Sequence, residues 1–160
     1  MARTETKPIS GLVANVLGYA DSVAARASDT VLLVGRLAMG IIFFQSSLAK
    51  LAALGAFSGS LGSRGVPFPG FLGPVGAISE FLGGAMIILG LGTRYAAGLI
   101  TIFVIIATAI SHRYWELAEP ARRLQQVQFY KNLAITGGAL FLFICAAGRF
   151  SLDAVLMKKR

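Results

Sequence analysis

The sequence contains four apolar stretches, each long enough to cross a lipid bilayer as a helix. They lie near residues 31–52, 71–92, 95–113 and 126–147. A helix rises about 1.5 Å per residue, so about 20 apolar residues cross about 30 Å of hydrocarbon. Hydrophobic residues make up 56% of the chain and charged residues 14%, against about a quarter charged in soluble domains. The sequence therefore predicts an all-α integral membrane protein, folded as an antiparallel four-helix bundle.

The first 30 residues carry a different pattern. Their apolar residues recur every three or four positions, while Asp21 and Arg26 fall elsewhere on the helical wheel. The recurring residues are Ile9, Leu12, Val13, Val16, Leu17, Ala20 and Val23. This spacing predicts an amphipathic helix lying at the membrane interface. A helix that docks on a partner within a larger complex would show the same pattern, so both interpretations stay open.

The connections differ in length. The first, residues 52–70, is rich in glycine and proline and is expected to hold a short helix at the outer surface. The second is only Gly92, Thr93 and Arg94, which predicts a tight antiparallel hairpin. After the fourth span, Ser151 is placed to cap a short terminal helix.

Basic residues outside the spans favour one side of the bundle. One side carries Arg3, Lys7, Arg26, Arg94, Arg149, Lys158, Lys159 and Arg160. The other side carries Arg64, Arg113, Arg122 and Arg123. By the positive-inside tendency, this bias places both termini in the cytoplasm. We therefore expect a multi-pass protein of the bacterial inner membrane, in contact with anionic lipid headgroups.

Composition argues against several functions. The net charge of +8 comes from residues that flank apolar runs, not from a basic surface stripe, so a nucleic-acid partner is not expected. Cys145 is the only cysteine and His112 the only histidine. The chain therefore cannot build a disulfide, a metal site or bis-histidine haem ligation by itself. No intrinsic cofactor is expected, and a bound small molecule such as a quinone is the candidate.

Glu80 is the only ionisable residue between Arg64 and Arg94. A carboxyl near the membrane centre opposes insertion by about 2.5 to 3.5 kcal/mol, so it needs a partner or a role. Gly76, Gly83 and Gly84 lie one turn before and after it, which predicts that Glu80 faces another helix.

Alternating span directions bring further polar residues to the same outer half of the membrane. Lys131 of the fourth span is expected to neutralise Glu80, with Asn132 adding a hydrogen bond. Lys50 is interpreted either as a cation that reaches the interface or as a ligand-contacting residue. Together these residues and His112 form a predicted outer cluster that could face a quinone headgroup. The Glu80 pair either fixes helix register or marks a quinone or proton path. Both alternatives remain open from sequence.

His112 precedes Arg113, Tyr114 and Trp115, where interfacial aromatic residues are expected. As the lone imidazole, it is also the candidate to exchange a proton with a quinone oxygen.

A second polar layer is expected near the opposite end of the bundle. Arg36, Gly40, Phe43, Ser47 and Lys50 share one face of the first span, and Gln45 lies opposite. On this face Arg36 is the residue nearest the cytoplasm. The tail residues Arg149 and Asp153 are expected to meet it there.

Seven short segments resemble the DoxX family of small four-helix bacterial membrane proteins. In order they are GRLAMGIIFF, LAKL, GVPFP, SEFLGGAMIILGLGTRYAAGL, SHRYW, FYKNLAITGGAL and GRFSLD. The resemblance divides the chain into an added N-terminal segment (1–30), a DoxX-like domain (31–155) and a basic tail (156–160).

The resemblance implies a small membrane subunit of a quinone-linked oxidoreductase or electron-transfer complex. A non-catalytic subunit that positions or assembles a larger membrane complex is the alternative. In either case, a membrane protein partner is expected. Whether the chain itself is catalytic stays open, because fold does not fix chemistry.

Overall fold

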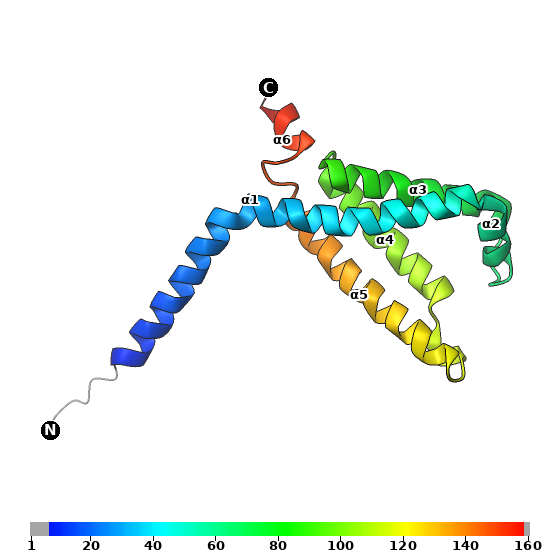
Figure 1. The fold of residues 1–160 in the computed structure, drawn as a ribbon, viewed down its shortest axis with the longest axis horizontal. Coiled ribbons are helices and arrows are strands. Elements are labelled where there is room, and N and C mark those ends of the chain that lie inside the picture. Colours follow the sequence, from blue (N-terminus) through cyan, green and yellow to red (C-terminus); the bar gives the residue numbers. More distant parts are fainter. Residues whose placement is uncertain (1–6, 159–160) are drawn as a thin grey trace.

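The computed structural model describes residues 7–158, with side chains from residue 11 onward. Every regular element in this part of the chain is a helix. The order is α1 (Lys7–Ala52), α2 (Leu54–Gly62), α3 (Pro69–Leu89), α4 (Thr93–Ser111), the 3₁₀ turn η1 (Tyr114–Glu116), α5 (Ala121–Cys145) and α6 (Leu152–Met157). The helices α1, α3, α4 and α5 are long and apolar enough to span a membrane. This confirms the predicted four-helix membrane fold (Figure 1).

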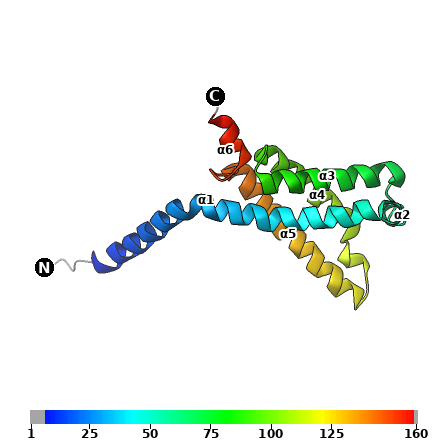
Figure 2. The same cartoon turned by 45° about the horizontal axis from the view of Figure 1, so that its top comes forward.

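Helix α1 joins the predicted interfacial segment to the first span without a break. Its 46 residues would extend about 69 Å at 1.5 Å per residue, more than twice the hydrocarbon thickness. Figures 1 and 2 show that α1 bends in its N-terminal half, so that its beginning projects away from the bundle. We call this projecting part, residues 11–28, the arm. The segment boundary placed at residue 30 from the sequence therefore lies within one continuous helix.

The core forms where α1 crosses α3 at two glycines. A Cβ atom on Gly84 would lie 2.9 Å from the backbone nitrogen of Phe44 and 3.1 Å from the carbonyl oxygen of Gly40. A Cβ atom on Gly40 would in turn lie 2.5 Å from a side-chain carbon of Ile88. Only glycine permits this backbone approach, as small residues do at membrane helix interfaces.

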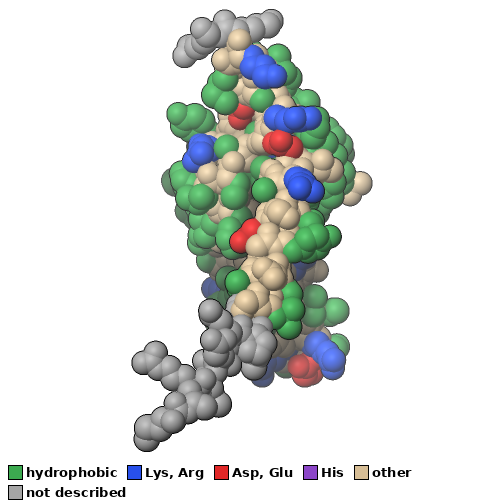
Figure 3. All heavy atoms as spheres, turned by 90° about the vertical axis from the view of Figure 1, so that its left-hand side faces the viewer, with side chains coloured by type: hydrophobic (Ala, Val, Ile, Leu, Met, Phe, Trp, Pro, Cys, Tyr) green, Lys and Arg blue, Asp and Glu red, His purple; other side chains and the backbone are tan. Residues whose placement is uncertain are grey.

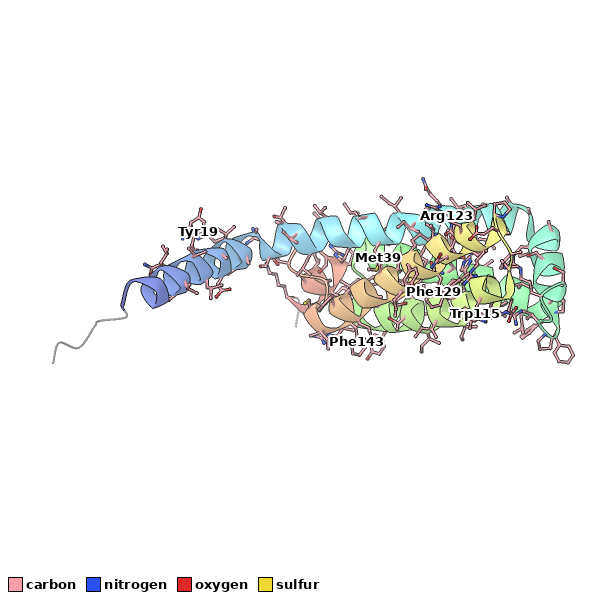
Figure 4. The ribbon with its side chains drawn as sticks, turned by 90° about the horizontal axis from the view of Figure 1, so that it is seen from below. Tyr19, Met39, Trp115, Arg123, Phe129 and Phe143 are labelled. Carbon is pink, nitrogen blue, oxygen red and sulfur yellow. The ribbon has the colours of Figure 1, made fainter. Side chains whose placement is uncertain are left out.

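Helix α4 packs against both α3 and α5 and carries half of the buried apolar cluster. That cluster comprises Phe43, Ile87, Ala96, Ala97, Ile100, Val104, Ala139 and Leu142. Helix α5 approaches α1 mainly near Gly138, where an added Cβ would lie 2.8 Å from the Met39 methyl carbon. Figure 4 shows Met39 at this crossing. Because α5 then diverges from α1 (Figure 1), the two helices share little surface toward the outer loops.

The predicted short elements are present. Helix α2 follows α1 within the first connection. The tight turn between α3 and α4 is Gly90, Leu91 and Gly92, two residues earlier than predicted, because Thr93 and Arg94 already belong to α4. Gly90 and Gly92 both have positive φ, at 65° and 54°, which favours glycine. The Ser151 hydroxyl accepts a hydrogen bond from the Ala154 amide at 3.2 Å. The terminal cap is thus confirmed.

Helix α6 docks on the turn between α3 and α4. The Asp153 carboxylate accepts hydrogen bonds from the backbone amides of Gly92 and Thr93, at 2.7 and 2.9 Å. The Asp153 amide donates to the Gly90 carbonyl at 2.9 Å. Partial burial acts to raise the pKa of Asp153. The amides of Thr93 and Gly92, with the charge of Arg36, outweigh that effect and hold the pKa below its ordinary 3.8.

The lowered pKa predicts an acid-sensitive tail. A depressed carboxyl pKa contributes stability at neutral pH that is lost as pH falls through the folded-state value. Asp153→Asn should lower the free energy of unfolding by about 1 kcal/mol at pH 7, because it weakens the hydrogen bonds to the Gly92 and Thr93 amides at the start of α4. The same change should remove this part of the acid sensitivity. Thermal unfolding in detergent at pH 7 and pH 3 measures both. Asp21→Asn on the exposed arm is the matched control, and equal acid sensitivity of wild type and Asp153→Asn would contradict the assignment.

Candidate functional site

Glu80 forms an ion pair with Lys50. The Lys50 Nζ atom lies 2.5 Å from Glu80 Oε2, and the two side chains are 26% and 4% exposed. The close crossing of α1 and α3 brings the two residues together, since Phe43 and Ser47 on the same face of α1 are buried and Phe43 lies beside Gly84 of α3. The predicted inward orientation of Glu80 is therefore confirmed.

The predicted partner of Glu80 was wrong. Lys131 is exposed and donates a hydrogen bond to the side-chain oxygen of Gln128, within α5. Lys131 does not take the place of Lys50, because α5 packs mainly on α4, whereas Glu80 lies on α3, which packs on α1. Lys50, interpreted from sequence as a cation that reaches the interface, is the residue that pairs with Glu80. Alternating helix direction fixes depth, but not which helices are neighbours.

Two aromatic rings flank Lys50. Its Nζ atom lies 5.4 Å from the ring centre of Phe57 and 5.7 Å from that of Phe103. These distances fall within the range of cation–π attraction. Phe57 comes from α2 and Phe103 from α4, so four helices converge on the ion pair. Sequence analysis missed both rings, because nothing in the local pattern places α2 over this position.

Lys50 lines a cavity of about 550 Å³ between α1, α2, α3 and α4. We call it the outer pocket. Its apolar lining consists chiefly of Leu61, Val66, Leu72, Val75, Leu99, Ile102, Phe103, Ile106 and Ile110. Ile102 and Ile106 are 61% and 52% exposed on the face of α4 that would meet lipid. The pocket therefore lies where a molecule dissolved in the bilayer could enter.

Polar side chains lie at several points on the pocket wall. His112 follows the last residue of α4, lines the pocket, and pairs through Nδ1 with the side-chain oxygen of Gln125 at 2.7 Å. Arg64 also lines the pocket, and its guanidinium donates a hydrogen bond to the Ser111 carbonyl at 3.4 Å. Gln125 and Arg64 were not predicted as site residues. Of the predicted outer cluster, Lys50 and His112 line this pocket, while Glu80 lies beside it through its ion pair.

Asn132 lies elsewhere. Its side-chain nitrogen donates to the Thr108 hydroxyl at 2.8 Å, which ties α5 to α4. Asn132 and Lys131 are not among the residues lining the pocket. The structure thus divides the predicted outer cluster into a pocket group on α1, α3 and α4 and a separate pair on α5.

The aromatic residues after His112 form a cluster. Tyr114 and Trp115 lie at ring-centre distances of 5.4 and 6.0 Å from Phe129, and Tyr130 lies 5.5 Å from Phe129 and 6.4 Å from Tyr114. Figure 4 shows Trp115 and Phe129 at one end of the bundle and Phe143 at the other. A cluster at the end of the spans is typical of an interfacial aromatic belt.

The second polar layer is present with different contacts. Arg36 is 1% exposed and donates to the backbone carbonyls of Phe150 and Ile87, the latter at 3.5 Å. The predicted meeting with the tail is therefore made through a backbone carbonyl. The Arg149 amide donates to the Asp29 carboxylate at 2.8 Å, with the two side chains 3.7 Å apart. Of the two tail side chains expected here, Asp153 lies close enough for its charge to interact with that of Arg36, whereas Arg149 faces Asp29.

Four spans around an internal ion pair and a lipid-facing pocket define a multi-pass helical membrane protein with a candidate ligand site. Comparison with known proteins gives its family. The DoxX family model matches residues 31–113, and the chain belongs to the DoxX family. The SURF4 family model matches residues 75–160.

Two Escherichia coli proteins resemble the chain over most of its length. Inner membrane protein YphA is 31% identical over 87% of this chain and 98% of its own length. Inner membrane protein YqjF is 31% identical over 84% of this chain and 98% of its own length. A Schizosaccharomyces pombe Surfeit locus protein 4 homolog is 28% identical over 43% of this chain and 24% of its own length. No solved structure matches. The chain is accordingly a bacterial inner membrane protein.

Proposed function

We propose that the protein is a membrane subunit that binds a quinone in the outer pocket and serves a quinone-linked oxidoreductase. The observation that carries the proposal is a largely apolar pocket with Lys50 and His112 on its wall. A volume of about 550 Å³ falls within the usual 300 to 1,000 Å³ of ligand sites. A quinone combines a ring bearing two carbonyl acceptors with an apolar tail, which matches this distribution of polar and apolar groups.

Each polar residue has a role in this proposal. The Lys50 ammonium donates a hydrogen bond to one quinone carbonyl while Glu80 balances its charge. His112, oriented by Gln125, donates to the second carbonyl or exchanges a proton there. The chain supplies binding and proton exchange, and a partner protein supplies the electrons. Both termini lie in the cytoplasm in this proposal, so the pocket occupies the periplasmic half of the membrane.

Binding can be followed through Trp115, the only tryptophan of the chain, three residues after His112. Titrating the protein in nanodiscs with a short-chain ubiquinone should quench Trp115 fluorescence saturably. His112→Ala should weaken binding about tenfold, because one hydrogen bond to a charged or polar acceptor is lost. The quinone content of lipid extracted from the purified protein, measured by chromatography, gives a second readout.

The matched control is Gln45→Ala, which changes an exposed residue on the opposite face of α1. It should bind quinone as the wild type does. Ala107→Phe, which fills part of the pocket, should abolish saturable quenching. If Ala107→Phe and His112→Ala both bind as the wild type does, the outer pocket is not a quinone site.

A second candidate function, a non-catalytic assembly subunit, is favoured by the arm. Leu12, Val16 and Leu17 on the arm are 66%, 60% and 59% exposed, and Figure 2 shows the arm projecting from the bundle. Figure 3 shows green hydrophobic side chains beside tan and charged ones along this part of the molecule. These exposed apolar side chains of the arm could pack on a membrane surface or on the apolar face of a partner protein.

Deleting residues 1–28 tests this candidate. In native membranes solubilised with mild detergent, the deletion should move the chain from a large complex to a small species on a native gel. Its thermal unfolding should change little, because the arm contributes nothing to the buried apolar cluster. Val16→Asp should act like the deletion, whereas Asn15→Asp, on the polar side of the arm, should not. Retention of the deletion variant in the complex would count against an assembly role.

A further inference from the structure

A second cleft lies at the end of the bundle opposite the outer pocket. It has a volume of about 460 Å³ and is formed by the start of α4, residues 146–149 and helix α6. We call it the tail cleft. Arg94 and Arg149 line it, as do the apolar parts of Tyr95, Leu156 and Met157. The quinone proposal does not use any of these residues.

The two arginines retain donors for a ligand. The structure records one hydrogen bond from the Arg94 guanidinium, to the Phe143 carbonyl at 3.1 Å. A guanidinium carries five N–H donors. The Arg149 side chain is 72% exposed and faces Asp29 at 3.7 Å, through Nε alone. Figure 3 shows Lys and Arg side chains in blue gathered with a few acidic ones in the half of this face nearest the tail.

The acidic group in the cleft is already engaged. Each carboxylate oxygen of Asp153 accepts a hydrogen bond from a backbone amide, one from Gly92 and the other from Thr93. Its negative charge is further compensated by Arg36, whose charge lies close enough to act on it. An incoming anion would therefore meet Arg94 without competition from Asp153, and it would share the Arg149 guanidinium with Asp29.

The position of the cleft indicates the kind of anion. Arg94 is the second residue of α4, and α5 ends at Cys145 just before the cleft. The cleft therefore lies at headgroup depth if these helices span the bilayer. Tyr95 and Met157 beside it are 84% and 71% exposed. An apolar surface next to two cations suits an amphiphile, since a soluble anion would leave that surface in water.

We propose that the tail cleft binds the phosphate group of an anionic phospholipid, with Arg94 and Arg149 donating to its oxygens and Tyr95 and Met157 contacting its acyl chains. Arginine forms strong charge-assisted hydrogen bonds with phosphate. Binding at this position holds α6 against the α3–α4 turn, because the ligand contacts both sides of the cleft. The site is independent of the outer pocket and of quinone.

Native mass spectrometry tests the proposal. Protein released from nanodiscs of mixed phosphatidylglycerol and phosphatidylcholine should retain phosphatidylglycerol preferentially. Arg94→Gln with Arg149→Gln should lower that retention about tenfold, since each basic residue near an anionic surface contributes measurably. Arg113→Gln with Arg123→Gln, two exposed arginines at the opposite end, is the matched control and should retain the lipid. Arg94→Lys should keep most of the binding.

The other outcomes overturn the proposal. Equal loss in both double variants would mean a general effect of positive charge, and equal retention of the two lipids would mean no anionic site. Displacement of the lipid by inorganic phosphate would assign the cleft to a soluble anion. If the double variant fails to fold, Arg149→Gln alone still decides, because this exposed side chain can lose its charge without disturbing the core. No loss of retention in that variant counts against the site.

Discussion

Glu80→Gln is expected to lower the free energy of unfolding by about 2 to 4 kcal/mol. The change leaves the Lys50 ammonium without its counter-charge between two aromatic rings, and breaking a buried ion pair from one side is costly. The partial exposure of Lys50, 26% of its side chain, keeps the effect below that of a fully buried pair. Unfolding by sodium dodecyl sulfate in mixed micelles, followed by circular dichroism, measures it.

A double variant distinguishes the interaction energy of the ion pair from the contributions of its two side chains. Lys50→Met with Glu80→Met removes both charges and keeps similar volume, so most of the lost stability should return. Gln45→Ala on the exposed face of α1 should change nothing. If the double variant loses as much stability as Lys50→Met and Glu80→Met lose in sum, the two residues do not act as a pair.

Gly84→Ala is expected to destabilise the protein by about 3 kcal/mol, at the upper end for an overpacked core. The added methyl group would meet the backbone of Phe44 and Gly40 on α1, and backbone atoms cannot move aside as a flexible side chain can. The crossing must open, which also separates Lys50 from Glu80. The same detergent-unfolding experiment should show a lower midpoint.

Gly76→Ala is the matched control, because Gly76 lies in the same helix two turns earlier. Its Cβ would meet only a ring carbon of Phe103, at 3.8 Å, which is ordinary contact. Alanine is favoured over glycine in a helix by about 1 kcal/mol, so this variant should be as stable as the wild type or more so. A loss at Gly76 equal to that at Gly84 would show that helix flexibility, not the α1–α3 crossing, explains the result.

The contrast between Lys50 and Lys131 shows how far sequence reasoning reached at the site. Apolar length and helical spacing correctly placed Glu80 inside the bundle and Arg36 on the buried face of α1. The choice of partner required knowing that α1 packs along α3 while α5 packs along α4. Both lysines lie at similar expected depth, so their sequence positions could not distinguish them. Phe57 and Gln125 were missed because each reaches the site from a connection or a neighbouring helix end.

The sequence by itself determined the four spans, the presence of a tight turn between the second and third spans, the capped tail and the family. These features depend on residues close together in the chain, where apolar length, glycine backbone freedom and capping groups act locally. Only the tertiary structure decided which lysine neutralises Glu80, where the pocket opens, and how Asp153 docks α6 on the turn between α3 and α4. Those outcomes depend on which helix faces approach one another, and that is set by the fit of glycines and bulky side chains across the whole bundle.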